Sequence, residues 1–132
     1  MLEAGIKGHQ EITVEEKDLA IYVGSGTVHV LATPMMIANM EYTAAASVEE
    51  LVGEGKSTVG IEVNVSHVAA TPKGMKVYFD SELLEVSENG KILTFHVEAH
   101  DECGLIGEGT HRRAIIDRER FDEKTQAKLE QR

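Results

Sequence analysis

Cysteine is almost absent from this chain, whose 132 residues include only one, Cys103. A single cysteine excludes an intrachain disulfide framework and a metal site built from several thiolates, and it fits a reducing compartment such as the cytoplasm. No apolar run approaches the roughly 20 residues that a membrane-spanning helix needs. The first ten residues also lack the basic segment and apolar stretch of a signal peptide. We therefore expect a cytoplasmic protein with no membrane partner.

Basic residues are also scarce, because Lys and Arg number 13 against 23 acidic residues and the net charge is −10. Affinity for a phosphate backbone comes largely from basic side chains, so no nucleic-acid partner is expected. The charge is uneven along the chain, and ten of the thirteen cations follow residue 72. The overall sign therefore does not describe every face of the molecule.

Proline occurs only at Pro34 and Pro72, and no Ser/Gly linker, low-complexity tract or internal repeat divides the chain. A length of 132 residues fits a single domain over 1–132. Such a domain buries roughly two-thirds of the surface that its unfolded chain exposes, so a real hydrophobic core is expected.

The clearest helix is predicted over residues 33–52. Thr33 is a suitable N-cap, Pro34 then falls at the first helical position, and Gly53 suits the C-cap. Apolar side chains cover most of the circumference of this helix. That distribution indicates a central, buried helix rather than a surface helix.

Most of the remaining chain alternates polar and apolar residues. This pattern predicts strands over 10–14, 57–70, 74–86, 92–100 and 106–118, followed by a charged helix over about 121–131. Residues 15–23 fit either a short helix or a strand. One buried helix followed by a run of antiparallel strands predicts an α+β protein in which a long sheet wraps around the helix, the hotdog arrangement. Such a sheet leaves an edge strand and a helix flank uncovered, so a homodimer is expected.

Three polar residues stand where chemistry is possible. Glu41 lies mid-helix among apolar neighbours, which makes it a candidate nucleophile or general base, or else a residue on the polar edge of the helix. His67 is predicted to share the core-side strand face of Ile61 and Val63, as an acid–base group near a loop or as a satisfied core histidine. Thr33 can polarise a carbonyl at the positive helix end, or serve only as the N-cap.

The remaining histidines do not predict a metal site. His96 and His100 lie four apart on one strand face, and His111 is expected to face solvent or a partner. No HExxH or Cys/His spacing, nucleophile elbow, phosphate loop or dinucleotide fingerprint occurs. We therefore expect neither a metal nor a cofactor.

Three stretches of the chain together resemble the hotdog-fold thioesterases, and the closest resemblance is to the fluoroacetyl-CoA thioesterase group. They are LATPMMIANMEYTAA, STVGIEVNVSHVAATPKG and VEAHDECGLIGEGTHRRAIIDRERF, and the resemblance covers roughly residues 8–125. It implies hydrolysis of a short-chain acyl-CoA thioester in a groove between two protomers. The family's catalytic residues fall on Thr33, Glu41 and His67, and its oxyanion-side glycine falls on Gly60. The bare N–H of a glycine can approach the thioester oxygen closely.

The resemblance leaves several alternatives open. Either Glu41 attacks the acyl carbon to form an anhydride or it activates water, while His67 supplies protons to the departing thiolate. The three residues come from one protomer or from two. The family's aromatic lid position falls at about Thr27, so selectivity for fluoroacetyl-CoA is not implied. A non-catalytic acyl-CoA-binding dimer is the alternative function, and a hydratase, whose histidine–aspartate signature is not apparent, ranks last.

Coenzyme A is itself an anion, yet a net charge of −10 does not exclude it as a ligand. Binding responds to the local potential, which ordinary salt screens beyond about 8–10 Å. We predict that Lys73 and Lys76, which flank the turn after His67, form a basic rim for the CoA phosphates together with Arg112 and Arg113 on the last strand.

Overall fold

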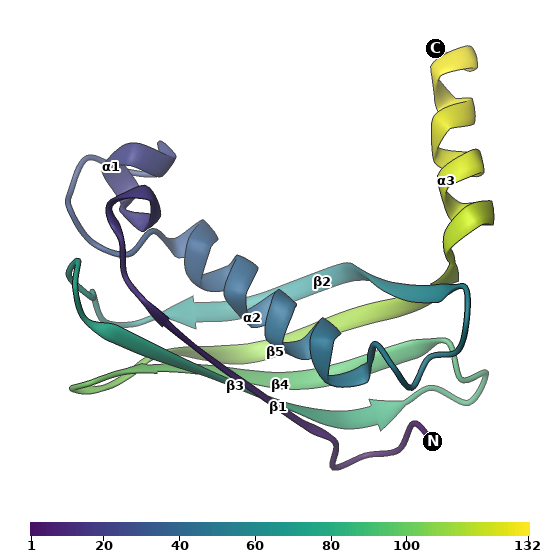
Figure 1. Cartoon of the computed structure of the whole chain (residues 1–132), viewed down its shortest axis with the longest axis horizontal. Coiled ribbons are helices and arrows are strands. Elements are labelled where there is room, and N and C mark those ends of the chain that lie inside the picture. The colour runs from purple at the N-terminus through teal and green to yellow at the C-terminus, as the bar shows by residue number, and fades with distance from the viewer.

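Five antiparallel strands form one sheet in the computed structural model, which describes all 132 residues. The strand order across the sheet is β1-β3-β4-β5-β2. The strands are β1 (Lys7–Thr13), β2 (Lys56–His67), β3 (Lys76–Val86), β4 (Ile92–Asp101) and β5 (Gly104–Asp117). The helix α2 (Thr33–Val48) lies across one face of the curved sheet (Figure 1). The predicted α+β architecture is therefore confirmed.

The shorter helices lie at the two ends of the chain. They are η1 (Glu16–Asp18), α1 (Ala20–Val23), α3 (Arg118–Gln126) and η2 (Ala127–Glu130). The ambiguous segment 15–23 is thus largely helical. The terminal helix begins three residues earlier than predicted, and it projects away from the sheet (Figure 1). None of the helices combines the length and the apolar composition needed to cross a membrane.

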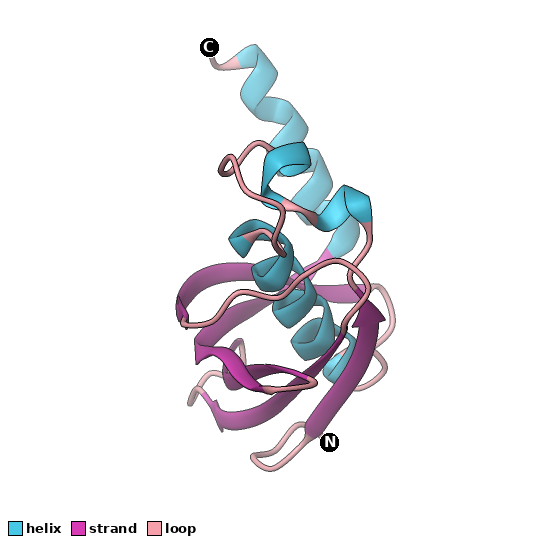
Figure 2. Ribbon diagram, turned by 90° about the vertical axis from the view of Figure 1, so that its left-hand side faces the viewer, coloured by secondary structure: helices cyan, strands magenta, loops and turns pink.

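The hydrophobic core lies between α2 and the middle of the sheet. Figure 2 shows this helix lying against the strands. Alternate residues of β3 and β4 point into it and are fully buried, as the period of two predicts: Val77, Phe79, Leu83, Leu93, Phe95, Val97 and Ala99. From α2, the buried side chains are those of Met36, Met40, Thr43, Ala44 and Val48. The core therefore occupies the centre of the sheet and leaves β2 at its edge.

The helix α2 differs from its prediction at both ends and around its circumference. Its N-cap is Ala32, so Thr33 is the first helical residue and its side chain makes no capping hydrogen bond. The helix ends at Val48 rather than at residue 52. One side only is buried, and the side chain of Tyr42 is 63% exposed. The predicted burial on most sides is wrong for the single chain, because the sheet covers only one face of the helix.

The edge strand β2 also differs from its prediction. Ile61 and Val63 are 47% and 40% exposed, although the alternation placed both on the core side. They are uncovered because β2 is the last strand of the sheet and has no neighbouring strand on its outer side. The chain therefore has the open edge strand that the sequence predicts.

Candidate functional site

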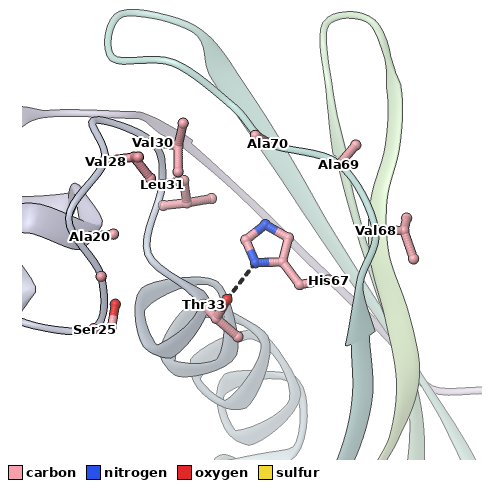
Figure 3. A pocket seen from close by; sticks show the side chains of 11 residues that line it. Ala20, Ser25, Val28, Val30, Leu31, Thr33, His67, Val68, Ala69 and Ala70 are labelled. Atoms are coloured by element: carbon pink, nitrogen blue, oxygen red, sulfur yellow. Dashed lines mark hydrogen bonds between the residues drawn. The ribbon is translucent and has the colours of Figure 1, made fainter.

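Thr33 and His67 form the first polar pair beside α2. Thr33 Oγ1 and His67 Nδ1 are hydrogen-bonded at 2.8 Å, which joins the first residue of α2 to the last residue of β2 (Figure 3). His67 Nε2 is buried and has no hydrogen-bond partner. Burial lowers the pKa of His67, and the backbone of Ala69 offsets this only in part. The ring is therefore held in the neutral form with one nitrogen free for proton transfer.

The same pair lines a cavity of about 340 Å³. Its walls are formed by the connection between α1 and α2 and by the residues that follow β2 (Figure 3). The other lining residues are small or aliphatic: Ala20, Ser25, Gly26, Val28, Val30, Leu31, Val68, Ala69 and Ala70. No Phe, Tyr or Trp side chain lines this cavity. The predicted lid position, Thr27, lies between two lining residues, so the cavity has an aliphatic wall there.

Glu41 lies on the next part of α2, directly against Gly60 of β2. A Cβ built on Gly60 would lie 2.5 Å from Glu41 Oε2 and 3.2 Å from His111 Cε1. A side chain at residue 60 would therefore displace the end of the Glu41 side chain and press on the His111 ring. Glycine leaves room here for the Glu41 carboxylate, whereas the sequence-based prediction concerns a different contact, that of the Gly60 N–H with the thioester oxygen.

A β-bulge brings Gly60 and His67 to the same side of β2. The register between β2 and β5 shifts between Gly60 and Glu62, which inserts Ile61 as an extra residue. Without the bulge, residues 60 and 67 would point to opposite faces of the sheet, because they are seven positions apart and side chains alternate. With it, Gly60 faces Glu41 and His67 faces Thr33, and both partners belong to α2.

A buried arginine lies against the Glu41 carboxylate. Arg113 Nη1 lies 3.5 Å from Glu41 Oε2, and the arginine side chain is 10% exposed. Its Nε donates to Thr58 Oγ1 at 2.8 Å and its Nη2 donates to the Thr58 carbonyl at 3.0 Å. Its Nη1 also lies 3.1 Å from His111 Nε2. The guanidinium is thus anchored on three sides and presents a fixed positive charge to Glu41.

His111 completes this cluster in one tautomer. Its Nε2 accepts from Arg113, which has only donors, so its Nδ1 carries the hydrogen and donates to the Glu62 carbonyl at 2.8 Å. Burial lowers the pKa of His111, and the charge of Arg113 lowers it further, whereas the Glu62 carbonyl and Glu41 raise it. The residue is 1% exposed, so the expectation that His111 faces solvent or a partner is wrong.

The structure does not bring Thr33, Glu41 and His67 to one point within the chain. Thr33 and Glu41 are eight residues apart on α2, which separates their backbones by about 12 Å. No hydrogen bond or ion pair joins the Thr33–His67 pair to the Glu41–Arg113 cluster. One chain therefore presents two neighbouring polar groups along the same helix.

The four residues predicted as a basic rim differ in their surroundings. Lys73 Nζ lies 3.9 Å from Glu16 Oε2, and Arg112 Nη1 lies 3.7 Å from Glu62 Oε1. Lys76 is exposed and makes no ion pair. Arg113 is buried against Glu41 and does not belong to an exposed rim. Consecutive residues of a strand point to opposite faces, so Arg113 points toward Glu41 while its neighbour Arg112 points to the exposed face.

That alternation was the signal that sequence reasoning missed. In the run HRRA, His111 and Arg113 share one strand face and Arg112 lies on the other, so both arginines cannot form the same surface. The pairing of Arg113 with Glu41 was not predictable, because it depends on the register between β2 and β5.

One further group of side chains lies on the opposite face of the sheet. His96, Glu98 and Glu108 bring potential ligand atoms within 4.8 Å of one another. His96 Nε2 lies 3.7 Å from Glu98 Oε2 and 3.9 Å from Glu108 Oε1, so carboxylates already surround the imidazole. His100 is not part of this group.

Comparison with known proteins adds one family and several structures. Residues 14–119 match the family model described as fluoroacetyl-CoA-specific thioesterase. The fluoroacetyl-CoA thioesterase of Streptantibioticus cattleyicolor is 37% identical over 99 residues, which cover 75% of this chain and 70% of that protein.

The structural comparisons cover nearly the whole chain. The fluoroacetyl-CoA thioesterase FlK superposes with a TM-score of 0.91 at 29% identity, over 97% of this chain and 98% of that one. A Thermus thermophilus member of the thioesterase superfamily gives a TM-score of 0.89 at 25% identity, over 99% and 96%. A hot-dog-like protein from Thermanaerovibrio acidaminovorans gives 0.86 at 17% identity, over 96% and 93%, and shows the fold alone. The predicted hotdog arrangement is therefore confirmed.

Proposed function

The chain belongs to the fluoroacetyl-CoA-specific thioesterase family, and from this premise we propose that it hydrolyses a short-chain acyl-CoA thioester to the free acid and CoA. The observation that carries the proposal is the Thr33–His67 hydrogen bond at the wall of an aliphatic cavity. It places a neutral imidazole with a free nitrogen beside a space suited to an acyl group. The aliphatic wall near Thr27 favours an unsubstituted or branched short acyl chain over a fluoroacetyl group.

The proposed reaction breaks the C–S bond of the thioester and forms a C–O bond to the oxygen of water. Glu41 either attacks the acyl carbon, and water then cleaves the anhydride, or it takes a proton from the water that attacks. The proton that the water releases is passed through His67 Nε2 to the departing sulfur, so the imidazole ends neutral as it began, and Thr33 orients the imidazole through Nδ1. The N–H of Gly60 donates to the thioester oxygen. No metal or other cofactor takes part, and CoA enters as part of the substrate.

A groove between two protomers is part of the same proposal. The separation of about 12 Å between Thr33 and Glu41 along α2 is too large for one reacting carbon to touch both within one chain. A second copy placed against the edge strand β2 would cover Ile61 and Val63, and it would bring its own polar groups to the first. In the homodimer, the Thr33–His67 pair of one chain would thus meet the Glu41 cluster of the other.

The proposal is tested by following free thiol release from a panel of acyl-CoAs that differ in chain length. We expect Glu41→Gln and His67→Ala each to lower kcat by about 10²–10⁴-fold, the usual cost of losing an acid–base group. Glu62→Gln is the matched control, because Glu62 is an exposed carboxylate on the outer face of β2. If both variants hydrolyse acyl-CoA within a few-fold of the wild type, the assignment is wrong. Tight acyl-CoA binding by the wild type without thiol release would favour the non-catalytic binding dimer.

A further inference from the structure

Five basic side chains gather where α3 leaves the sheet, and we call this group the basic cluster. Its members are Lys56 at the start of β2, Lys91 in the turn before β4, and Arg120, Lys124 and Lys128 along α3 and η2. They line two adjoining cavities of about 260 Å³ and 420 Å³, which share Phe121 and Lys124. In a chain with a net charge of −10, this is a local concentration of positive charge.

None of the five side chains of the basic cluster forms an ion pair, although α3 and η2 also carry the carboxylates of Glu119, Asp122, Glu123 and Glu130. The five basic residues that do form ion pairs with carboxylates all lie outside it: Lys17, Lys73, Arg112, Arg113 and Arg118. Asp117 is the one carboxylate that lines either cavity, and its side chain is used to cap α3 by accepting from the N–H of Arg120. The basic cluster therefore has no internal counter-charge within ion-pair distance.

The helix that carries most of this charge is poorly supported. No residue of α3 or η2 is buried. Arg120, Lys124 and Lys128 follow one another at intervals of four, so like charges repel along one side of the segment, and only Glu123, three residues after Arg120, is spaced to offset this. A helix this short is marginal in water without packing against a neighbour. A bound anion would remove the repulsion and hold α3 in place.

The apolar part of the two cavities indicates what kind of anion fits. Phe121 is 38% exposed between them, and Ile115 and Ile116 line the first. An aromatic ring flanked by cations is the arrangement on which nucleotides bind, with the base stacked on the ring and the phosphates on the basic side chains.

We propose that the basic cluster binds the phosphorylated adenosine end of the CoA thioester, with the adenine against Phe121 and the phosphates between the lysines of α3 and the sheet. This rests on the proposed function, because it places the substrate of that reaction. Lys56 precedes Gly60 by four residues on β2, about 13 Å at the rise of a strand. The extended pantetheine arm of CoA spans such a distance, so the phosphates reach the basic cluster while the thioester lies at Gly60.

The test compares two triple variants that lose the same charge. One is Arg120→Gln/Lys124→Gln/Lys128→Gln, and the other is Lys73→Gln/Lys76→Gln/Arg112→Gln, which removes the exposed residues of the predicted rim. Each is assayed with an acyl-CoA and with the same acyl group on N-acetylcysteamine, which has no phosphates. We expect the first triple to raise KM for the acyl-CoA by about tenfold, from three lost exposed ion pairs, with kcat and both constants for the short thioester unchanged.

Several results would overturn the proposal. The first is an unchanged KM for the acyl-CoA in the Arg120/Lys124/Lys128 triple variant. The second is an equal rise in KM for both substrates in that variant. The third is a rise in KM for the acyl-CoA in the Lys73/Lys76/Arg112 variant instead. A second measurement uses calorimetric titration of CoA itself, for which the first triple should bind about tenfold more weakly than the wild type at low salt. This titration does not depend on hydrolysis. If the wild type cleaves neither thioester but CoA binding responds as expected, the proposed function fails and the site survives.

The titration also separates CoA from other anions. If a single-stranded oligonucleotide or vesicles of anionic lipid bind the wild type and lose affinity in the first triple, while CoA affinity does not change, the basic cluster serves a different partner and the proposal is wrong. Circular dichroism of the first triple shows whether the fold is retained, which we expect because α3 contributes nothing to the core.

Discussion

The two polar groups along α2 are built in opposite ways. The Glu41–Arg113 cluster is anchored, because Arg113 and His111 form hydrogen bonds with Thr58, with Glu62 and with each other. The Thr33–His67 pair rests on a single hydrogen bond at the mouth of a cavity, and one imidazole nitrogen is free. The first group can hold a charge in place and the second can exchange a proton. Mutations should therefore affect stability in the first group and rate in both.

After the loss of Glu41 or His67 themselves, the largest effect is expected where a side chain would displace Glu41. In Gly60→Ala, the new Cβ meets the end of the Glu41 side chain, which can move aside, but the carboxylate then leaves its position. We expect kcat to fall by about 10²-fold, the usual cost of a misplacement near 1 Å, with a thermal midpoint close to that of the wild type. Asn64→Ala, on the outer face of the same strand, is the control. A Gly60→Ala enzyme with wild-type kcat would show that Glu41 does not act at this point.

Arg112 and Arg113 provide the next test, because they are chemically identical neighbours on opposite faces of β5. Arg113→Gln leaves Glu41, Thr58 and His111 without their partner, so we expect about 1–3 kcal/mol less free energy of unfolding and about tenfold lower kcat. Arg112→Gln breaks one exposed ion pair with Glu62, and the loss should stay within about 0.5 kcal/mol. Urea denaturation measures both values. Equal losses in the two variants would contradict the anchored role of Arg113.

Breaking the Thr33–His67 hydrogen bond should lower the rate of hydrolysis but leave the stability of the fold unchanged. Thr33→Val removes the hydroxyl that holds His67 Nδ1, and Thr33 is exposed, so water replaces the lost hydrogen bond. We expect kcat to fall by about tenfold and the free energy of unfolding to change by less than about 0.5 kcal/mol. Thr33→Ser keeps the hydroxyl and should keep most of the activity. If Thr33→Val and Thr33→Ser have the same kcat, the hydroxyl does not orient the imidazole.

The smallest effect is a pH dependence of stability that the two histidines share. Burial lowers the pKa of His67 and of His111, so the unfolded chain binds protons that the folded chain resists. Their contribution to stability is present above the unfolded pKa of about 6.5 and is lost as pH falls through it toward the lower folded value. Protonation of His111 would also disrupt its bond from Arg113. Urea denaturation of wild type and His111→Asn at a series of pH values should show a shallower acid loss in the variant.

An exposed histidine acts in the opposite direction. Hydrogen bonds to Asp80 and Glu11 raise the pKa of His9, so its contribution is present at low pH and is lost as pH rises through the raised value. His9→Gln should therefore steepen the acid loss, whereas His111→Asn should reduce it. The same slope in both variants would mean that neither imidazole is perturbed as its surroundings indicate.

Sequence reasoning worked where one local rule decides the outcome. Alternation along residues 74–86 and 92–100 predicted the buried faces of β3 and β4, because each strand needs only a period of two to separate core from solvent. Thr33 shows the limit of such rules. A hydroxyl before Pro34 suits an N-cap, yet Ala32 takes that position and the hydroxyl binds His67, which is 34 residues away. A rule based on neighbouring residues does not include a hydrogen-bond partner such as His67, which comes from a distant strand.

The rest depended on register. One inserted residue at Ile61 decides whether Gly60 and His67 share a face of the sheet. Neither the composition nor the spacing of residues in the strand predicts this bulge. The predicted rim failed at Arg113 because adjacent strand residues point apart, and the basic cluster was missed because its five members lie far apart along the chain. The roles of Thr33, Glu41, His67 and Gly60 in catalysis stay predictions until the variants are measured.

By itself, then, the sequence determined the elements, the α+β class, the acidic balance and the family, since these follow from local pattern and from ordered motifs. Only the tertiary structure decided which polar groups meet: Thr33 with His67, Glu41 with Arg113, and Lys56 and Lys91 with α3. The physical reason is that these contacts join residues from distant parts of the chain. Their distances depend on strand order, on one bulge and on the position of α2 across the sheet.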